Sequence, residues 1–106
     1  MNIKILTPEF VVFDGEVKSV LLPGKNGDFH IMKDHAAIVA SLINGKIKVF
    51  ADFIDEKYAD KFKKEKESVY SFKIKSGVIE FSNNKGIILA EWLTPENENK
   101  KEVPKK

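Results

Sequence analysis

Residues 16–42 constrain the fold of this chain more than any other stretch, because three apolar segments lie there between short polar corners. The first corner runs from Pro23-Gly24 to Gly27, and the second is the loop at residues 33–35. Short apolar runs between such corners are typical of β-strands. The stretch therefore predicts part of a β-sandwich or barrel. We expect the corner at residues 26–28 and the loop at residues 33–35 to emerge near one rim, which would be the working surface.

The flanking segments support an all-β domain. Asp14-Gly15 is a tight-turn pair between two apolar runs, which predicts a hairpin at this point. Asn44-Gly45 is a second such pair, and lysine alternates with apolar residues after it, as in a strand with one wet face. We therefore predict an antiparallel β-sandwich of about eight to ten short strands over residues 1–92. Residues 93–106 are polar and charged, and we expect them to form a disordered tail.

Residues 51–67 differ in composition from the rest, because 11 of the 17 are charged and none is glycine or proline. Ile54, Tyr58 and Phe62 recur every four residues, which favours one face of a short amphipathic helix. Residues 49–53 also alternate between apolar and other side chains, so a long protruding hairpin is the second interpretation. Either way, the segment is interpreted as a charged insertion in the sandwich.

The composition argues against several classes of function. The 106 residues include no cysteine, which excludes a disulfide framework and a cysteine-based zinc site. All 18 basic residues are lysine, and the net charge is only +2, so charge alone does not favour nucleic-acid binding. No apolar run approaches the roughly 18 residues that a membrane-spanning helix needs, and the N-terminus lacks the features of a secretory signal.

Two histidines invite a metal-site interpretation, since His30 and His35 lie close in sequence to Asp28 and Asp34. Positions 30 and 35 differ by an odd number, so a continuous strand would point the two side chains to opposite faces. Only a sharp loop could bring them together. We therefore predict no metal site here.

The chain also lacks the patterns of an enzyme. Its serines do not lie in a strained elbow of the G-x-S-x-G kind, and no glycine-rich loop precedes a helix with a Lys-Ser or Lys-Thr pair. We expect no catalytic residue and no cofactor. Tyr70 and Phe72 are interleaved with Lys73 and Lys75, so a single-stranded nucleic-acid-binding module is the alternative function. Strand alternation favours the core for these two aromatic side chains. The residues therefore indicate a binding or structural module.

Motifs spread over residues 2–91 together carry a resemblance to a known family. They are Thr7-Pro8-Glu9, Phe13-Asp14-Gly15-Glu16-Val17, Leu22-Pro23-Gly24, Gly27-Asp28-Phe29, His35-Ala36, Ile43-Asn44-Gly45-Lys46-Ile47, the segment 77–84 and Leu89-Ala90-Glu91. In this combination the chain resembles the N-terminal β-sandwich of the epsilon subunit of F-type ATP synthases.

The resemblance implies a non-catalytic role in a rotor. In this family the sandwich sits at the foot of the central stalk, where it grips the gamma subunit and the polar loops of the membrane c-ring. It thereby helps to couple proton or sodium flow to ATP synthesis. The implied partners are these two components, without nucleic acid or a bound nucleotide, and the implied location is peripheral, on the cytoplasmic face of the bacterial inner membrane.

The resemblance also implies the contact residues. Asp28 matches the family's acidic residue after the turn glycine, and His35 matches the histidine of its Pro-Gly-His loop. The residues expected to face the c-ring are therefore Asp28, Phe29, His30, Ile31, Met32 and His35.

The sequence departs from the family pattern at several points. Lys33-Asp34 stands in place of the usual Pro-Gly, His30 stands where glycine is common, and residues 51–67 exceed the usual short connection. Only 15 residues follow Glu91, which is too few for a two-helix hairpin, since they would make at most about 22 Å of helix. We therefore expect no C-terminal inhibitory latch in this chain.

Overall fold

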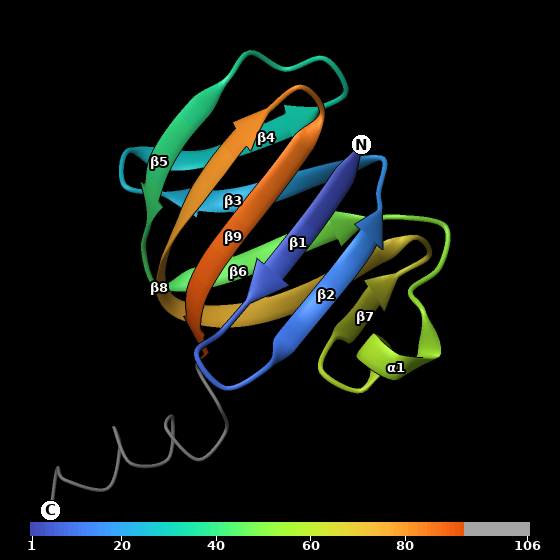
Figure 1. Cartoon of the computed structure of the whole chain (residues 1–106). Coiled ribbons are helices and arrows are strands. Elements are labelled where there is room, and N and C mark those ends of the chain that lie inside the picture. The colour runs from blue at the N-terminus through green and yellow to red at the C-terminus, as the bar shows by residue number, and fades with distance from the viewer. Residues whose placement is uncertain (93–106) are drawn as a thin grey trace, which may run out of the picture.

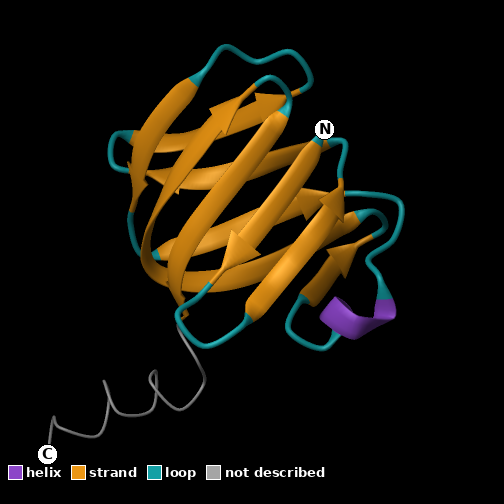
Figure 2. Cartoon of the chain, viewed as in Figure 1, coloured by secondary structure: helices purple, strands orange, loops and turns teal. Residues whose placement is uncertain are grey.

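Residues 1–92 are described by the computed structural model, and strands dominate them (Figures 1 and 2). This confirms the predicted all-β sandwich. The predicted tail at residues 93–106 lies outside the described residues. The elements are β1 Asn2–Leu6, β2 Val11–Glu16, β3 Ser19–Gly24, β4 Gly27–Met32, β5 Ile38–Leu42, β6 Gly45–Phe50, α1 Glu56–Ala59, β7 Lys63–Lys66, β8 Val69–Ser82 and β9 Lys85–Trp92.

The strands form two layers, and the long strand β8 belongs to both (Figure 1). The first half of β8 pairs with β6 and β7, and its second half pairs with β5 and β9. The register shifts between Ile74 and Ser76, at the point where β8 passes from one layer to the other. Such a bulge bends a strand. The front layer therefore runs β2-β1-β9-β8-β5, with β1 and β9 parallel, and the rear layer runs β4-β3-β6-β8-β7.

The core fills the space between the layers, and strand alternation decides which residues reach it. On β9, Ile88 and Ala90 are buried, whereas Ile87 and Leu89 are exposed on the outer face. The same period of two applies on β1, where Ile3 and Ile5 are fully buried. The largest fully buried side chains are Phe72, Phe81, Ile3, Ile5, Leu22, Ile31, Ile47, Ile74, Ile79 and Ile88.

The hairpin predicted at Asp14-Gly15 is wrong. Both residues lie inside β2, where they pair with β1, and the turn between β1 and β2 is at residues 7–10 instead. The Thr7 hydroxyl oxygen accepts a hydrogen bond from the amide of Phe10 at 3.1 Å, which holds this turn. Gly15 has a different reason to be glycine. A Cβ there would lie 3.2 Å from the ring of Phe13, so the glycine makes room for that buried ring.

The expectation of one rim is also wrong. The turn at residues 25–26 precedes β4, and the loop at residues 33–37 follows it, so the two lie at opposite ends of this strand (Figure 1). A strand of six residues spans about 20 Å. The two loops that the sequence analysis placed together are therefore separated by the length of β4.

The insertion at residues 51–67 contains both a helix and a hairpin. Helix α1 has only four residues, so the predicted stripe from Ile54 to Phe62 extends beyond it. The chain then forms β7, which pairs with the free edge of β8. The apolar side chains still act together, because Ile54 is buried and both Tyr58 and Phe62 pack against the core. The ring of Phe62 lies 5.7 Å from that of Phe72, so the insertion covers one end of the sandwich.

Candidate functional site

The six residues expected to form an interface lie on β4 and in the loop after it, but they do not share one surface. Ile31 is fully buried, and Phe29 is half-buried and packs against the core. Asp28 and Met32 are exposed, and 56% of the Met32 side chain is accessible. Because β4 alternates, its outer face carries Asp28, His30 and Met32 only.

His30 is held in place on the outer face of the rear layer. Its Nε2 lies 2.9 Å from the hydroxyl oxygen of Ser19 on the neighbouring strand β3. Its ring centre is 5.0 Å from that of Phe50 on β6. The imidazole of His30 on β4 thus contacts side chains on both β3 and β6. These two contacts hold the ring in one orientation at the surface.

His35 lies in the loop at residues 33–37, which follows the C-terminal end of β4. Its amide donates a hydrogen bond to the carbonyl of Met32 at 3.0 Å, and its Nδ1 lies 2.6 Å from the carbonyl oxygen of Ala36. The ring meets Phe81 edge-on at 6.0 Å. His35 is therefore partly buried, whereas Asp28 is exposed, and the two residues lie toward opposite ends of β4. Within residues 1–92, no three His, Asp or Glu side chains gather in a way that could hold a metal ion.

An apolar surface on the front layer was missed by the sequence analysis. A row of directly paired apolar residues crosses four strands there, from β8 through β9 and β1 to β2. Two more exposed apolar residues, Val39 on β5 and Ile87 on β9, lie in the next cross-strand row, where Glu80 on β8 stands between them and Lys4 on β1 pairs with Ile87. The row consists of Val78, Leu89, Leu6 and Val11.

This apolar face continues into an open groove of about 1110 Å³ at the end of β9. The turn between β1 and β2, residues 76–78 of β8 and the end of β9, including Trp92, line the groove. The ring of Trp92 meets Phe10 edge-on at 5.0 Å. We refer to the row, the two apolar residues next to it and this groove as the apolar face. The sequence carries a signal for it, because residues 87–90 are apolar at both parities, which is typical of strands covered on both sides.

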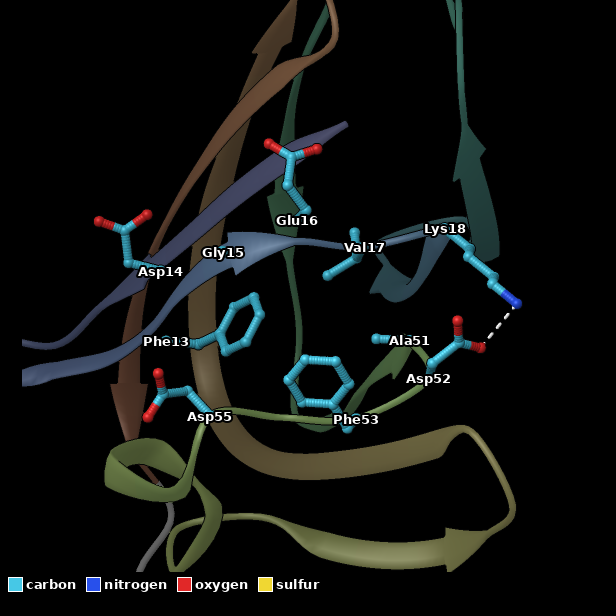
Figure 3. A pocket seen from close by; sticks show the side chains of 10 residues that line it. All are labelled: Phe13, Asp14, Gly15, Glu16, Val17, Lys18, Ala51, Asp52, Phe53 and Asp55. Atoms are coloured by element: carbon cyan, nitrogen blue, oxygen red, sulfur yellow. Dashed lines mark ion pairs between the residues drawn. The ribbon is translucent and has the colours of Figure 1, made fainter.

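A second hollow, of about 420 Å³, lies between β2 and the insertion (Figure 3). Phe13 and Phe53 face it, and 76% of the Phe53 side chain is accessible. At its edge, the ammonium of Lys18 pairs with Asp52 at 2.8 Å. Its lining residues include four carboxylates and Lys18, but no histidine, serine, threonine or cysteine.

One carboxylate in the described part of the chain is electrostatically distinctive. The hydroxyl of Ser71 donates a hydrogen bond to Glu65, and Lys46 lies 3.2 Å from the same oxygen. The pKa of the Glu65 carboxyl is lowered, first by the Ser71 hydrogen bond and then by Lys46. These contacts join β7 to β8 and β6. The Glu65 carboxylate therefore helps to hold the insertion against the sandwich.

The burial of the aromatic residues contradicts the nucleic-acid alternative. Phe72 is only 2% exposed, and Tyr70 is half-buried against the core. Stacking on bases requires exposed rings, so these two side chains do not form a stacking platform. In the described region, no helix has the length and apolar character to cross a membrane.

Comparisons with known proteins agree with this fold. Residues 1–96 match the family described as ATP synthase, Delta/Epsilon chain, beta-sandwich domain. The ATP synthase epsilon chain of Chlorobium limicola is 39% identical over 90 residues, which cover 85% of this chain and 88% of that one. The epsilon chain of Chlorobaculum tepidum is 35% identical over 93 residues, which cover 88% and 91% of the two chains.

Two solved structures share the fold at 13% sequence identity. One is the central stalk and c-ring of the Tetrahymena thermophila mitochondrial ATP synthase, with a TM-score of 0.63 over 99% of this chain and 88% of that one. The other is the OSCP/F1/c-ring structure of the Euglena gracilis mitochondrial ATP synthase, with a TM-score of 0.68 over 97% and 61%. The family match over residues 1–96 and the two relatives at 39% and 35% identity show that this chain belongs to the epsilon-chain family of ATP synthases.

Proposed function

We propose that this chain is a non-catalytic rotor subunit of an F-type ATP synthase, in which it links the gamma subunit to the c-ring. Through that link it couples proton or sodium flow to ATP synthesis at the cytoplasmic face of the bacterial inner membrane. A close-packed sandwich provides the stiffness that torque transmission needs. The observation that carries the proposal is the apolar face on one layer of this body, because its row of four paired apolar side chains and the adjoining groove form an exposed apolar patch, and such patches can mark interaction sites.

The apolar face is the proposed contact with the gamma subunit. It crosses four strands in register and has a groove at one end, so it offers both a flat and a hollow surface to a partner. Apolar and aromatic residues are typical of the centre of a stable interface. The loop at residues 33–37 leads into β5, which carries Val39, so His35 lies at the margin of the same surface.

The turn before Asp28 is the proposed contact with the c-ring. It forms the tip of the hairpin between β3 and β4, and Asp28 is exposed next to it. Because this tip and the loop at residues 33–37 lie at opposite ends of β4, one strand can bridge two partners. The expected six-residue site is thus divided in this proposal. Asp28 faces the ring, His35 adjoins the gamma contact, His30 and Met32 lie on the strand between them, and Phe29 and Ile31 support that strand from the core.

Changing Asp28→Lys is expected to weaken binding to a detergent-solubilised c-ring about 10-fold, because it reverses a charge that faces the polar ring loops. The measurement is a titration of the purified chain against the c-ring. Glu67→Lys makes the same charge change at a side chain that is 90% exposed in the turn between β7 and β8, and it is the matched control. Equal loss of affinity in both variants would contradict the ring assignment.

Changing Val39→Lys is expected to weaken binding to the purified gamma subunit about 10-fold or more, because it places a charge in a desolvated apolar contact. Phe53→Lys is the control, since Phe53 is equally exposed but lies on the insertion, away from the apolar face. Both substitutions are at exposed positions and should leave the melting temperature nearly unchanged. If wild-type chain binds neither gamma nor the c-ring at micromolar concentration, the proposed function is wrong.

A further inference from the structure

We propose that Asn84 is a positioning residue for partner binding, because its side-chain amide holds the loop at residues 33–37 in the conformation that meets the gamma subunit. This inference rests on the proposed function, which places that loop at the margin of the gamma contact. Asn84 itself lies in the turn between β8 and β9, 50 residues away in the sequence from the loop that it holds.

The contact between the two segments is a reciprocal pair of hydrogen bonds. The backbone amide of Asp34 donates to Oδ1 of Asn84 at 2.6 Å. In return, Nδ2 of Asn84 donates to the carboxylate Oδ1 of Asp34 at 2.9 Å. The side-chain amide of Asn84 therefore binds one loop residue, Asp34, through both its oxygen and its nitrogen. A side chain that could donate only, or accept only, would make half of this contact.

The backbone of Asn84 is held by the hairpin turn between β8 and β9. Asn83 and Asn84 have φ angles of 51° and 61° and lie between the paired residues Ser82 and Lys85. Two positive φ angles at the centre of a two-residue hairpin loop are typical of a type I′ turn, in which asparagine is favoured. In addition, the carbonyl of Asn84 accepts a hydrogen bond from the amide of Asn2 at 3.0 Å, which ties the turn to β1.

The loop that Asn84 contacts also contains a residue with positive φ. Asp34 has a φ of 67°, in the left-handed region that residues other than glycine adopt at a cost. The next residue is His35, whose ring contacts Phe81 of β8, and the loop then enters β5. Without Asn84, the loop would sample other conformations, and binding would have to order it again. Ordering of a segment on binding lowers affinity.

The sequence offers a closely matched control for this idea. Asn83 and Asn84 are neighbours in the same turn, both with positive φ, but the loop contact is made by Asn84. Glycine tolerates positive φ at both positions. Asn83→Gly and Asn84→Gly therefore change the turn alike, and they differ in the loss of the contact with Asp34.

The first test measures the loop directly. In the full-length chain, hydrogen exchange at the Asp34 amide should be about 10-fold faster in Asn84→Gly than in Asn83→Gly, because this amide loses its acceptor. The two variants should melt within a few degrees of each other, since the contact is exposed. Equal exchange rates at Asp34 in the two variants would overturn the inference, irrespective of the result of the gamma-binding measurement.

The second test measures binding to the purified gamma subunit. Asn84→Gly should bind about 10-fold more weakly than Asn83→Gly. Asn84→Asp should also bind weakly, because two carboxylates then face each other, whereas the exchanged pair Asp34→Asn with Asn84→Asp should restore affinity. If wild-type binds and the two glycine variants bind equally, this inference fails and the proposed function stands. If wild-type binds the c-ring but not gamma, this inference fails together with the gamma contact, and if it binds neither, the whole proposed function fails.

Discussion

Replacing Phe72 with alanine is expected to lower the free energy of unfolding by about 3–5 kcal/mol. Phe72 is 2% exposed and lies on the half of β8 that belongs to the rear layer. Its ring contacts Phe62 of the insertion at 5.7 Å and stacks with Trp92 at 6.0 Å. Truncation therefore removes the transfer free energy of a buried ring and leaves a cavity that touches both the core and the insertion. The loss would be a large fraction of the roughly 5–15 kcal/mol that a domain of this size has.

Urea unfolding monitored by the single tryptophan measures this effect, and the melting temperature should fall by at least about 12 °C. Phe53→Ala is the control, because the same ring is deleted where the side chain is 76% exposed, and the expected change there is within about 0.5 kcal/mol. The experiment also separates two functions. An aromatic platform for nucleic acid would lose oligonucleotide affinity at Phe72 with little loss of stability, and that result would contradict the core position.

The strands themselves could largely be predicted from the sequence, since the information is local. Glycine and polar residues bound β3, β4 and β5, and all three are present close to the expected positions. Lysine alternates with isoleucine and valine on β6, and the structure buries Ile47 and Val49 as that pattern predicts. A half-buried strand needs only its own period to be recognised.

Pairing partners and turn positions could not be predicted, because they depend on distant residues. Asp14-Gly15 has the chemistry of a tight turn, yet both residues pair with β1, and glycine there serves the packing of Phe13. In the same way, the four-residue spacing of the insertion correctly marks an apolar stripe. The helix nevertheless ends at Ala59, and β7 pairs with the free edge of β8. Tertiary pairing outweighs local propensity in both cases.

The candidate site was only partly predictable for a related reason. The residues of β4 were identified, but their division between core and surface follows from which layer lies beneath them. Ile31 and Met32 are adjacent in sequence, and one is fully buried whereas the other is 56% exposed. The apolar face was missed because apolar residues at both parities of a strand are typical of a strand covered on both sides, whereas the structure leaves the outer side of β9 exposed at Ile87 and Leu89.

The two proposed contacts depend on β4 as a rigid connection. Its outer face carries Asp28 near one end and Met32 near the other, and Ile31 anchors it in the core from below. In the proposed function, this packed strand would connect the hairpin tip to the loop at residues 33–37, which Asn84 holds to the front layer.

Replacing Phe62 with alanine is expected to lower the free energy of unfolding by about 2–3 kcal/mol, at the lower end for phenylalanine because its side chain is half-buried. Phe62 contacts Phe13 on β2 at 5.9 Å and Phe72 on β8 at 5.7 Å, so it covers the end of the core between the layers. The change should expose both rings and can be measured by urea unfolding. The affinity for the c-ring should be unchanged in the folded protein, since the Asp28 turn lies at the tip of the hairpin between β3 and β4, away from the insertion.

Lys57→Ala is the control for this last prediction, because Lys57 lies on α1 of the same insertion with an exposed side chain. It should change stability by no more than about 0.5 kcal/mol. If Phe62→Ala is as stable as Lys57→Ala but binds gamma or the c-ring more weakly, the insertion acts as a partner surface rather than as a cover for the core. If Phe62→Ala is instead less stable than Lys57→Ala and binds both partners normally, Phe62 acts with Phe13 and Phe72 to cover one end of the core. The charged residues of the insertion then serve to keep its outer side in contact with water.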